Sequence, residues 1–389
     1  MFSLSGFAEL LKHLPRRVFD HAVQRHEADK HSKGFNSWQQ LVVMLYAQLA
    51  GLSSLRSLIA SFNAHPNHHY HLGCKTVARS TLSDANSQGD WRVFQAVAEA
   101  LMQGVSGKIA RDGKDFMRLI DSTSFTLKGP GFDEWTLPSR VRPGAQGMKL
   151  HVVYSPGKQA PLACELSSPR LNDLNYAREL ALEAGCTYVF DKAYCDYNWW
   201  WQMTQQGVKF VTRLKKNASV KVLSERRIAR AARGIILKDE KILLANKNPG
   251  AGRKNLYSKQ LRRIEVWREN EPALVLVSND LKSSALNISE QYKARWQIEL
   301  YFKWIKQHLK LKKFLGRSEQ AVKIQILTAL IAYLLVWMHA RARNVKDLWL
   351  HLCTLSSTLF QREQTERDRH RRWRESQTMI EALQVPLFA

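Results

Sequence analysis

Two acidic residues stand at the ends of predicted strands, where a carboxylate is fixed in place and still accessible. Asp121 follows the predicted strand segment MRLI at 117–120, and Asp191 follows TYVF at 187–190. An apolar strand fixes the backbone while its last residue is exposed, which is why functional groups gather at strand ends in open sheets. An Asp that caps the following turn explains either residue alone. Two such acids at two strand ends are harder to explain in this way and together predict a carboxylate site.

A predicted long helix over residues 288–309 carries the third set of polar side chains. At 100° per residue, four of them fall within about 60° of one another: Tyr292, Arg295, Glu299 and Lys306. Apolar residues project from the other side to hold the helix on the sheet: Ile298, Phe302, Ile305 and Leu309. A charged stripe of this kind usually just faces solvent, so the helix alone does not indicate catalysis.

The spacing of these four polar residues, Y-x2-R-x3-E-x6-K, resembles the signature of DDE transposases of the insertion-sequence-4 group. The segments around the two acids are also similar to that family, with IDST at 120–123 and DKAY at 191–194. The resemblance spans residues 115–310 and includes a β-rich insertion before the Glu299 helix. It implies an RNase H-like fold with Asp121, Asp191 and Glu299 as the catalytic triad.

Three carboxylates suit this chemistry because phosphodiester cleavage develops charge on both the attacking and the leaving oxygen. Two Mg2+ ions about 3.5–4 Å apart stabilise both oxygens, and hard cations of this kind take oxygen ligands. The resemblance implies that Asp121 bridges the two ions and that Asp191 and Glu299 each bind one of them, with Mn2+ as a substitute metal.

The resemblance further implies cut-and-paste transposition, in which a freed 3′-OH first closes a DNA hairpin and later joins target DNA. The implied partner is double-stranded DNA, both element ends and target, bound by a homodimer in a synaptic complex. Arg295 and Lys306, with the hydroxyl of Tyr292, are expected to contact phosphates beside the scissile bond.

A hairpin intermediate requires an unstacked base, which an aromatic residue of the insertion holds in this family. Trp267 is the candidate, because strand alternation places it on the same side as Arg263 and Glu265. A Trp packed in the core is the alternative.

The order of predicted elements indicates an α/β fold, a mixed sheet with helices on both faces. Strands are expected at 116–120, 148–154, 162–166, 187–190 and 208–212, with helices at 176–184 and 199–206. Further strands at 235–237, 242–245, 261–267 and 274–277 form the insertion. We therefore predict a helical domain at 1–110, a catalytic domain at 111–212 plus 277–345, an insertion at 213–276 and a helical tail at 346–389.

The N-terminal region reads as helical, with helices expected at 38–50, 55–62 and from 79 to 101. Two short helices followed by a third suit a small DNA-binding domain. Its candidate DNA contacts are Arg79, Ser80 and Asn86 at the start of the third helix. A helical cap or a dimerisation domain is the alternative.

The charge of the chain points to an acidic polymer as partner. The formal net charge is +25, and the windows 212–233 and 292–323 together carry +14 of it, so the excess is localised. The second window is amphipathic and aromatic, as expected for a packed helix along a phosphate track. Two further readings remain open: a non-enzymatic DNA-binding regulator, and a structure-specific nuclease on the same fold.

Other sequence features favour a cytoplasmic protein, associated with the nucleoid of a bacterium and not with a membrane. The five cysteines are odd in number and form no C-x-x-C pair, which suits reduced thiols. We identify no signal peptide. The longest apolar run, 326–340, is shorter than a membrane-spanning helix requires and predicts a buried helix.

Several other groups of residues resemble functional sites, but their spacing or position does not support that interpretation. The stretch 65–74 has four histidines and a cysteine, but its spacing is that of neither a zinc finger nor a ribbon, so a plain loop is expected. The acids Asp133, Glu134 and Asp196 do not end predicted strands, and Trp199, Trp200 and Trp201 are left without a role. The glycines near 250 indicate a turn.

Overall fold

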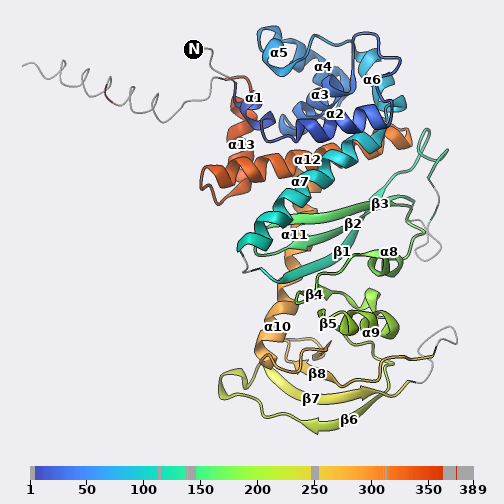
Figure 1. The fold of residues 1–389 in the computed structure, drawn as a ribbon, viewed down its shortest axis with the longest axis vertical. Coiled ribbons are helices and arrows are strands. Elements are labelled where there is room, and N and C mark those ends of the chain that lie inside the picture. Colours follow the sequence, from blue (N-terminus) through green and yellow to red (C-terminus); the bar gives the residue numbers. More distant parts are fainter. Residues whose placement is uncertain are drawn as a thin grey trace, which may run out of the picture.

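The computed structural model describes residues 5–112, 115–136, 138, 146–246, 254–309, 311, 313–361 and 374. Along its longest axis lie a helical part, a central sheet with helices packed on it, and a strand-rich end (Figure 1). The predicted mixed α/β architecture is confirmed. The basic stretch 362–374, expected to be helical, lies outside the described residues apart from Arg374, and so does the expected turn near 250.

Local signals explain the helices that precede the first strand. These are α1 (Gly6–Leu11), α2 (Arg16–Arg25), α3 (Ser37–Leu49), α4 (Leu55–Asn63), α5 (Pro66–Leu72), α6 (Arg79–Gln88) and α7 (Trp91–Asp112). Asn36 and Gln39 form a reciprocal capping box at the start of α3. The Ser54 side chain accepts a hydrogen bond from the Ser57 N–H and so caps α4.

The His-rich stretch expected to be a plain loop is mostly helix α5, so that prediction is wrong. Pro66 occupies the first turn, where its missing N–H costs nothing, and Gly73 ends the helix in the left-handed conformation. The imidazoles serve packing: His69 stacks on Phe62 with ring centroids 4.3 Å apart, and its Nε2 lies 3.0 Å from the Phe62 carbonyl oxygen.

Nine strands form one mixed sheet in the order β3-β2-β1-β4-β5-β9-β8-β7-β6. The strands are β1 (Met117–Thr126), β2 (Gly147–Ser155), β3 (Ala160–Ser167), β4 (Thr187–Phe190), β5 (Lys209–Arg213), β6 (Val220–Glu225), β7 (Ile236–Leu244), β8 (Leu261–Val266) and β9 (Leu274–Ser278). The pairs β1–β4 and β4–β5 are parallel, whereas all others in the described sheet are antiparallel.

The insertion strands continue the central sheet, because β9 pairs directly with β5. Two expectations here are wrong. The strands predicted at 235–237 and 242–245 are one strand, β7. Its middle residues Lys238, Asp239 and Glu240 are polar, so the sequence pattern predicts a break there. Residues 220–225 lie in the basic window 212–233, where no strand is predicted, yet they form the outer strand β6. Its largely exposed side chains suit a sheet edge.

Neighbouring residues of β1 serve the two faces of the sheet, as strand alternation requires. Leu119 packs with α10 (Ala285–Ala294), α11 (Trp296–His308) and the helical part. Ile120 packs with α8 (Asp173–Glu179) and α9 (Tyr197–Gln205). Of the three tryptophans left without a role, Trp199 and Trp200 are buried in this second core, so they are structural.

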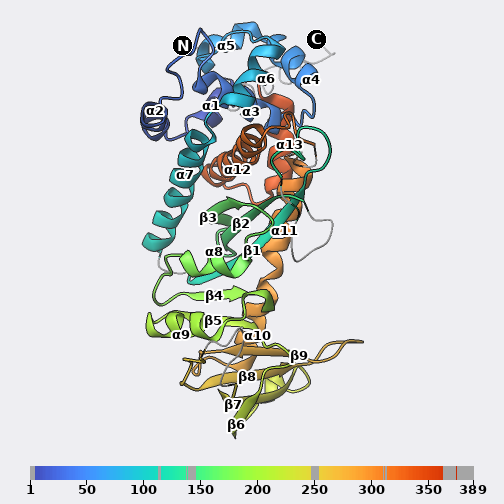
Figure 2. The ribbon, with the colours of Figure 1, turned by 90° about the vertical axis from the view of Figure 1, so that its right-hand side faces the viewer.

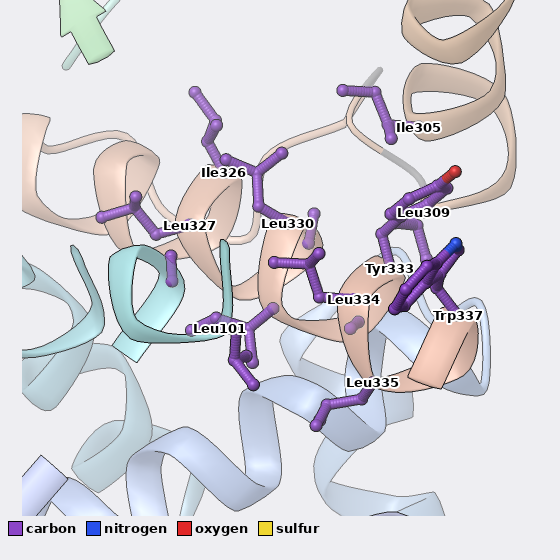
Figure 3. Close-up of a cluster of buried hydrophobic side chains, with 14 of the residues drawn as sticks. Leu101, Ile305, Leu309, Ile326, Leu327, Leu330, Tyr333, Leu334, Leu335 and Trp337 are labelled. Carbon is purple, nitrogen blue, oxygen red and sulfur yellow. The ribbon is translucent and has the colours of Figure 1, made fainter. Parts of the chain in front are cut away.

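Helix α12 (Glu319–Ala342) joins the helical part to the sheet. Figure 3 shows its leucines against Leu101 of α7 on one side and Ile305 of α11 on the other. Tyr333 and Trp337 donate hydrogen bonds to the Gln159 and Lys158 carbonyl oxygens in the β2–β3 turn. The helix is long and apolar enough to cross a membrane, but 89% of its most apolar window is buried inside the protein. The predicted buried helix is confirmed.

A buried imidazole pair next to this core makes stability depend on pH. His339 of α12 and His351 of α13 (Leu348–Thr358) are buried, and their Nδ1 and Nε2 atoms are 2.8 Å apart. Burial, with Arg343 and His351 nearby, lowers the pKa of His339 to about 3. An unfolded histidine takes up a proton near pH 6.5, so the unfolded state binds more protons below that value and stability falls with it.

We therefore expect the free energy of unfolding to decrease as the pH falls from 7 to 5.5, by up to about 1.4 kcal/mol per pH unit for one such imidazole. Urea unfolding at a series of pH values measures this slope. His339→Leu should flatten it, whereas His21→Leu, a change at an exposed position of α2, should not. A slope that is unchanged in His339→Leu would contradict the assignment.

Candidate active site

The parallel pairing of β1 and β4 brings the two predicted acids together. Ile120 lies opposite Phe190 in the register, so Asp121 and Asp191 follow paired residues on strands about 4.8 Å apart. One detail of the prediction is wrong: Asp121 does not end β1, which continues to Thr126. The parallel partner ends instead, and beyond Ile120 the strand pairs only with β2. Asp121 therefore lies at the end of the ladder without being at the end of its strand.

Backbone donors and one buried aromatic ring hold the two carboxylates in place. The Ser122 N–H donates to Asp121 Oδ1 over 2.8 Å, and the Lys192 N–H donates to Asp191 Oδ1 over 2.6 Å. Asp191 begins a short 3-10 turn, Lys192–Tyr194. Tyr194 is buried against Phe190, with ring centroids 5.9 Å apart, and so anchors this turn beneath the acid.

The predicted helix over 288–309 is two helices, α10 and α11, with Arg295 at the junction, so the prediction of one helix is wrong. The cause is local, because the hydrogen bonds at the junction tighten. The Arg295 N–H donates to the Tyr292 carbonyl and the Ile298 N–H to the Arg295 carbonyl, both i to i+3 bonds. Arg295 keeps helical angles, φ −53° and ψ −31°, so the stripe of polar side chains survives.

Arg295 connects the helix pair to the sheet. Its Nη2 lies 2.6 Å from Glu299 Oε1, and its Nη1 lies 3.4 Å from Asp121 Oδ2. Its guanidinium carbon is 5.8 Å from the ring centroid of the buried Tyr292. The structure thus brings Asp121, Asp191, Glu299, Arg295 and Tyr292 to one end of the parallel ladder.

Lys306 lies about two turns beyond Glu299 on α11. Its ammonium group donates to the Ser124 carbonyl oxygen over 2.8 Å and stands 5.0 Å from the ring centroid of Phe125. Both contacts are to the second half of β1, beyond Asp121. Lys306 therefore extends the basic side of the site along that strand, and burial lowers the pKa of its ammonium group.

Charge repulsion is built into this site. The pKa of Asp121 is raised to about 6, mainly by burial and further by the carboxylates of Glu299 and Asp191, against the opposing effects of the Ser122 N–H and Arg295. The nearby Arg295 guanidinium therefore does not fully offset the burial of the Asp121 carboxyl group. A cation bound beside Asp121 would favour its ionised form.

The donor chemistry of the site fits a divalent metal. Carboxylate oxygens from three segments are the ligands that hard cations prefer. In the described part of the chain, no three acidic, His or Cys side chains converge tightly enough to hold one ion. The guanidinium of Arg295 lies between Asp121 and Glu299, so a metal bound there would replace it as their counter-charge.

Trp267 is exposed over 54% of its surface, so the alternative of a core Trp is wrong. It directly follows β8, and Val266 pairs with Leu274 at the start of β9. Arg213 at the end of β5 pairs with Leu276 of the same strand. Trp267 therefore lies at the same end of the strands as Asp191, which follows β4. Strands β8 and β4 are three positions apart in the sheet, which corresponds to on the order of 15 Å.

The N-terminal candidates divide into two kinds. Arg79 and Ser80 are exposed at the start of α6. Asn86 is only 2% exposed; it accepts from Gln40 Nε2 over 2.9 Å and donates to the sulfur of Met44 over 3.4 Å. The prediction of Asn86 as a DNA contact is wrong, because its side chain faces α3 and fixes α6 to it.

A polar network next to Asp121 was not predicted from the sequence. On the opposite face of β1, the Ser122 hydroxyl donates to Asp173 Oδ1 over 2.8 Å, and Lys149 Nζ donates to the same oxygen over 3.0 Å. His151, fully buried, lies 3.6 Å from that oxygen. Polar residues in the otherwise apolar strand β2 were the available signal. The remaining acids have structural roles: Asp196 pairs with Arg178 and caps α9, and Asp133 accepts from Gln146.

Comparison with known proteins identifies the family of the chain. Residues 114–335 match the family model described as Transposase DDE domain, and residues 3–75 match a Domain of unknown function (DUF4372). A protein of Sinorhizobium fredii named as a transposase, y4zB, is 38% identical over 68% of this chain and 72% of its own length. A protein of Synechocystis named for insertion sequence element IS4SA is 26% identical over 73% of this chain and 76% of its own length.

A similar protein of Geobacillus stearothermophilus, named for insertion sequence element IS5377, is 26% identical over 63% of this chain and 62% of its own length. Among solved structures, a piggyBac transposase synaptic complex with hairpin DNA aligns with a TM-score of 0.47 at 11% identity, over 90% of this chain and 77% of that one. Since the DDE domain match spans more than half of the sequence and contains all three clustered acids, the chain belongs to the DDE transposase family and is a DNA transposase.

Proposed function

We propose that this transposase belongs to the insertion-sequence-4 group and carries out cut-and-paste transposition on an RNase H-like core. The main support for this proposal is the position of the Arg295 guanidinium, which contacts Glu299 and Asp121 where β4 ends at Asp191. Arg295 and Glu299 belong to the signature spacing, and Asp121 and Asp191 are the two acids predicted from strand ends. The order of the sheet, with parallel strands β1, β4 and β5 beside the antiparallel β2 and β3, supports this choice.

In this proposal Asp121, Asp191 and Glu299 hold two Mg2+ ions, or Mn2+ in their place. The metals supply charge stabilisation for the attacking and leaving oxygens of an in-line displacement. Asp121 would contribute to holding both ions, and the other two acids would each help to hold one. The Ser122 and Lys192 N–H groups keep the two Asp carboxylates oriented, whereas Arg295 would have to leave Asp121 and Glu299 for a metal to bind between them.

The basic and aromatic residues position DNA. Arg295 exchanges its carboxylate partners for a phosphate beside the scissile bond, the Tyr292 hydroxyl donates to the same strand, and Lys306 binds a neighbouring phosphate. Trp267 stacks on the base displaced by the hairpin; its exposure at the same edge of the sheet supports this role.

The protein acts as a homodimer that pairs two element ends, in the bacterial cytoplasm at the nucleoid. The predicted division holds in this proposal, with a DNA-binding helical domain at 1–110, a catalytic domain at 111–212 plus 277–345, an insertion at 213–276 and a tail at 346–389. Within the first of these, Arg79 and Ser80 contact the DNA.

A strand-joining assay tests this function. A duplex that carries the sequence flanking the gene, supplied with a pre-cut 3′-OH end, is expected to yield joined product with plasmid DNA when Mg2+ is present and none with EDTA. The uncut duplex should yield a hairpin intermediate. Gel mapping of labelled strands reads out both products.

The two alternatives give different results in the same assay. A structure-specific nuclease would cleave the DNA but leave the pre-cut end unjoined. A DNA-binding regulator would bind the duplex and slow its migration in the gel, but it would neither cut nor join a strand. Either outcome would contradict the proposal of cut-and-paste transposition.

A further inference from the structure

A basic hollow lies between the helical part and the segment that follows α11. It has a volume of about 810 Å3 and is lined by α4, α6 and residues 314–317. Three arginines from these separate segments line it, Arg56, Arg79 and Arg317, together with hydroxyl groups such as those of Ser80 and Ser83. Asp84 is the one carboxylate in its lining.

The three arginines are exposed and extend from fixed backbone positions. Arg56 and Arg79 lie in the first turns of two helices, which fixes their backbones. Arg317 donates from Nη1 to the Pro130 carbonyl oxygen over 3.1 Å, and its stem lies against Gly131. None of the three forms an ion pair with any carboxylate that the structure describes. Like charges that converge without a partner repel, so an anion bound there would stabilise the arrangement.

Two packed aromatic rings connect the lining of the hollow to Lys306. Phe314 lines it and packs edge-on against Phe125, with ring centroids 6.2 Å apart. The same Phe125 ring lies under the ammonium group of Lys306. One aromatic ring thus separates the hollow from a residue proposed to bind phosphate, and α4 and α11 lie on the same side of the molecule (Figure 2).

We propose that this hollow binds the sugar-phosphate backbone of the duplex whose end lies at Asp121, a few nucleotides beyond the scissile phosphate. Successive phosphates of one strand are spaced about 3.4 Å apart along the duplex axis, so a single strand reaches from Lys306 to Arg317 and on to the helical part. The hollow gives affinity and register without reading bases, because its lining offers guanidinium and hydroxyl donors to phosphate oxygens. This inference rests on the proposed function.

A salt titration of the full chain tests the hollow. The triple variant Arg56→Ala, Arg79→Ala and Arg317→Ala is compared with a control that loses the same charge, Arg17→Ala, Arg25→Ala and Lys33→Ala. The control positions lie on α2 or just after it, are exposed and form no ion pair with a described carboxylate. Fluorescence anisotropy with a labelled element-end duplex, without divalent ions, gives log K against log salt.

We expect the slope for the hollow variant to become less negative by about 0.9 for each arginine that contacts a phosphate. The control variant should keep the wild-type slope. Hydroxyl-radical footprinting should show that the hollow variant alone loses protection a few nucleotides from the cleavage site. Single Arg→Gln variants give the same information if the triple variant does not fold, as judged by circular dichroism.

Two results would overturn the inference: a wild-type slope and footprint in the hollow variant, or an equal change of slope in both variants. The second would mean that only the total charge matters. Failure of the proposed function looks different, because wild-type protein would then produce no joined strands however tightly it binds DNA.

Discussion

Replacing Asp121 with Asn is expected to reduce Mg2+-dependent cleavage of element-end DNA by on the order of 10³-fold or more. The substitution keeps the size of the side chain and its bond from the Ser122 N–H, but it removes the charge that holds a divalent cation. DNA affinity should not fall, because the Asp121 carboxylate makes no attractive contact with phosphate. Cleavage and anisotropy assays measure the two quantities separately.

The other two acids provide an internal check. Asp191→Asn and Glu299→Gln should give losses of similar size, since the proposal makes the three carboxylates one metal-binding unit. Glu134→Gln is the matched control, because Glu134 is an exposed acid with no ion pair to any described residue. Full cleavage activity in all three variants would exclude the triad, and a loss in Glu134→Gln would show that the assay reports general damage.

Replacing Arg262 with Ala is expected to lower the free energy of unfolding by about 3–5 kcal/mol. Arg262 is 1% exposed, and its Nε and Nη2 lie 2.7 and 2.6 Å from the two carboxylate oxygens of Asp239. Its Nη1 also donates to the Ser283 carbonyl oxygen just before α10. Truncation leaves the Asp239 carboxylate buried without its main partner and removes the tie between β8, β7 and the start of the helix pair.

A double substitution separates the pair from its packing. Arg262→Met with Asp239→Leu removes both charges, so it should destabilise the protein less than Arg262→Ala alone. Urea unfolding of the wild type, of Arg262→Met, of Asp239→Leu and of the double variant completes the cycle. A loss below about 1 kcal/mol in Arg262→Ala would contradict the assignment of a buried, mutually dependent pair.

The parts of the fold that could be predicted are those with a strong local pattern. Strand β4 was predicted with its observed bounds because it is a short apolar run buried at every residue. The apolar core of α12 was equally clear. Strand β7 was split in prediction because its buried Asp239 and Glu240 look like loop residues until Arg262 and Arg263 are seen opposite them.

The same distinction holds for the site. Spacing along one helix predicted that Arg295 and Glu299 share a face, and strand ends predicted Asp121 and Asp191. Contacts between distant segments have no periodic signal. Neither Asn86, which turns inward toward Gln40, nor the convergence of Arg317 on the helical part could be inferred from neighbouring residues.

The position of α12 in the chain has a consequence for synthesis on the ribosome. The buried faces of α3 and α7 pack on a helix whose translation begins more than 200 residues after the synthesis of both is complete. At about 5–20 residues per second, the early helices wait on the order of tens of seconds with their apolar surface uncovered. A copy of the gene interrupted before codon 319 therefore yields a chain that chaperones and proteases remove, not a stable DNA-binding fragment that competes with intact protein for element ends.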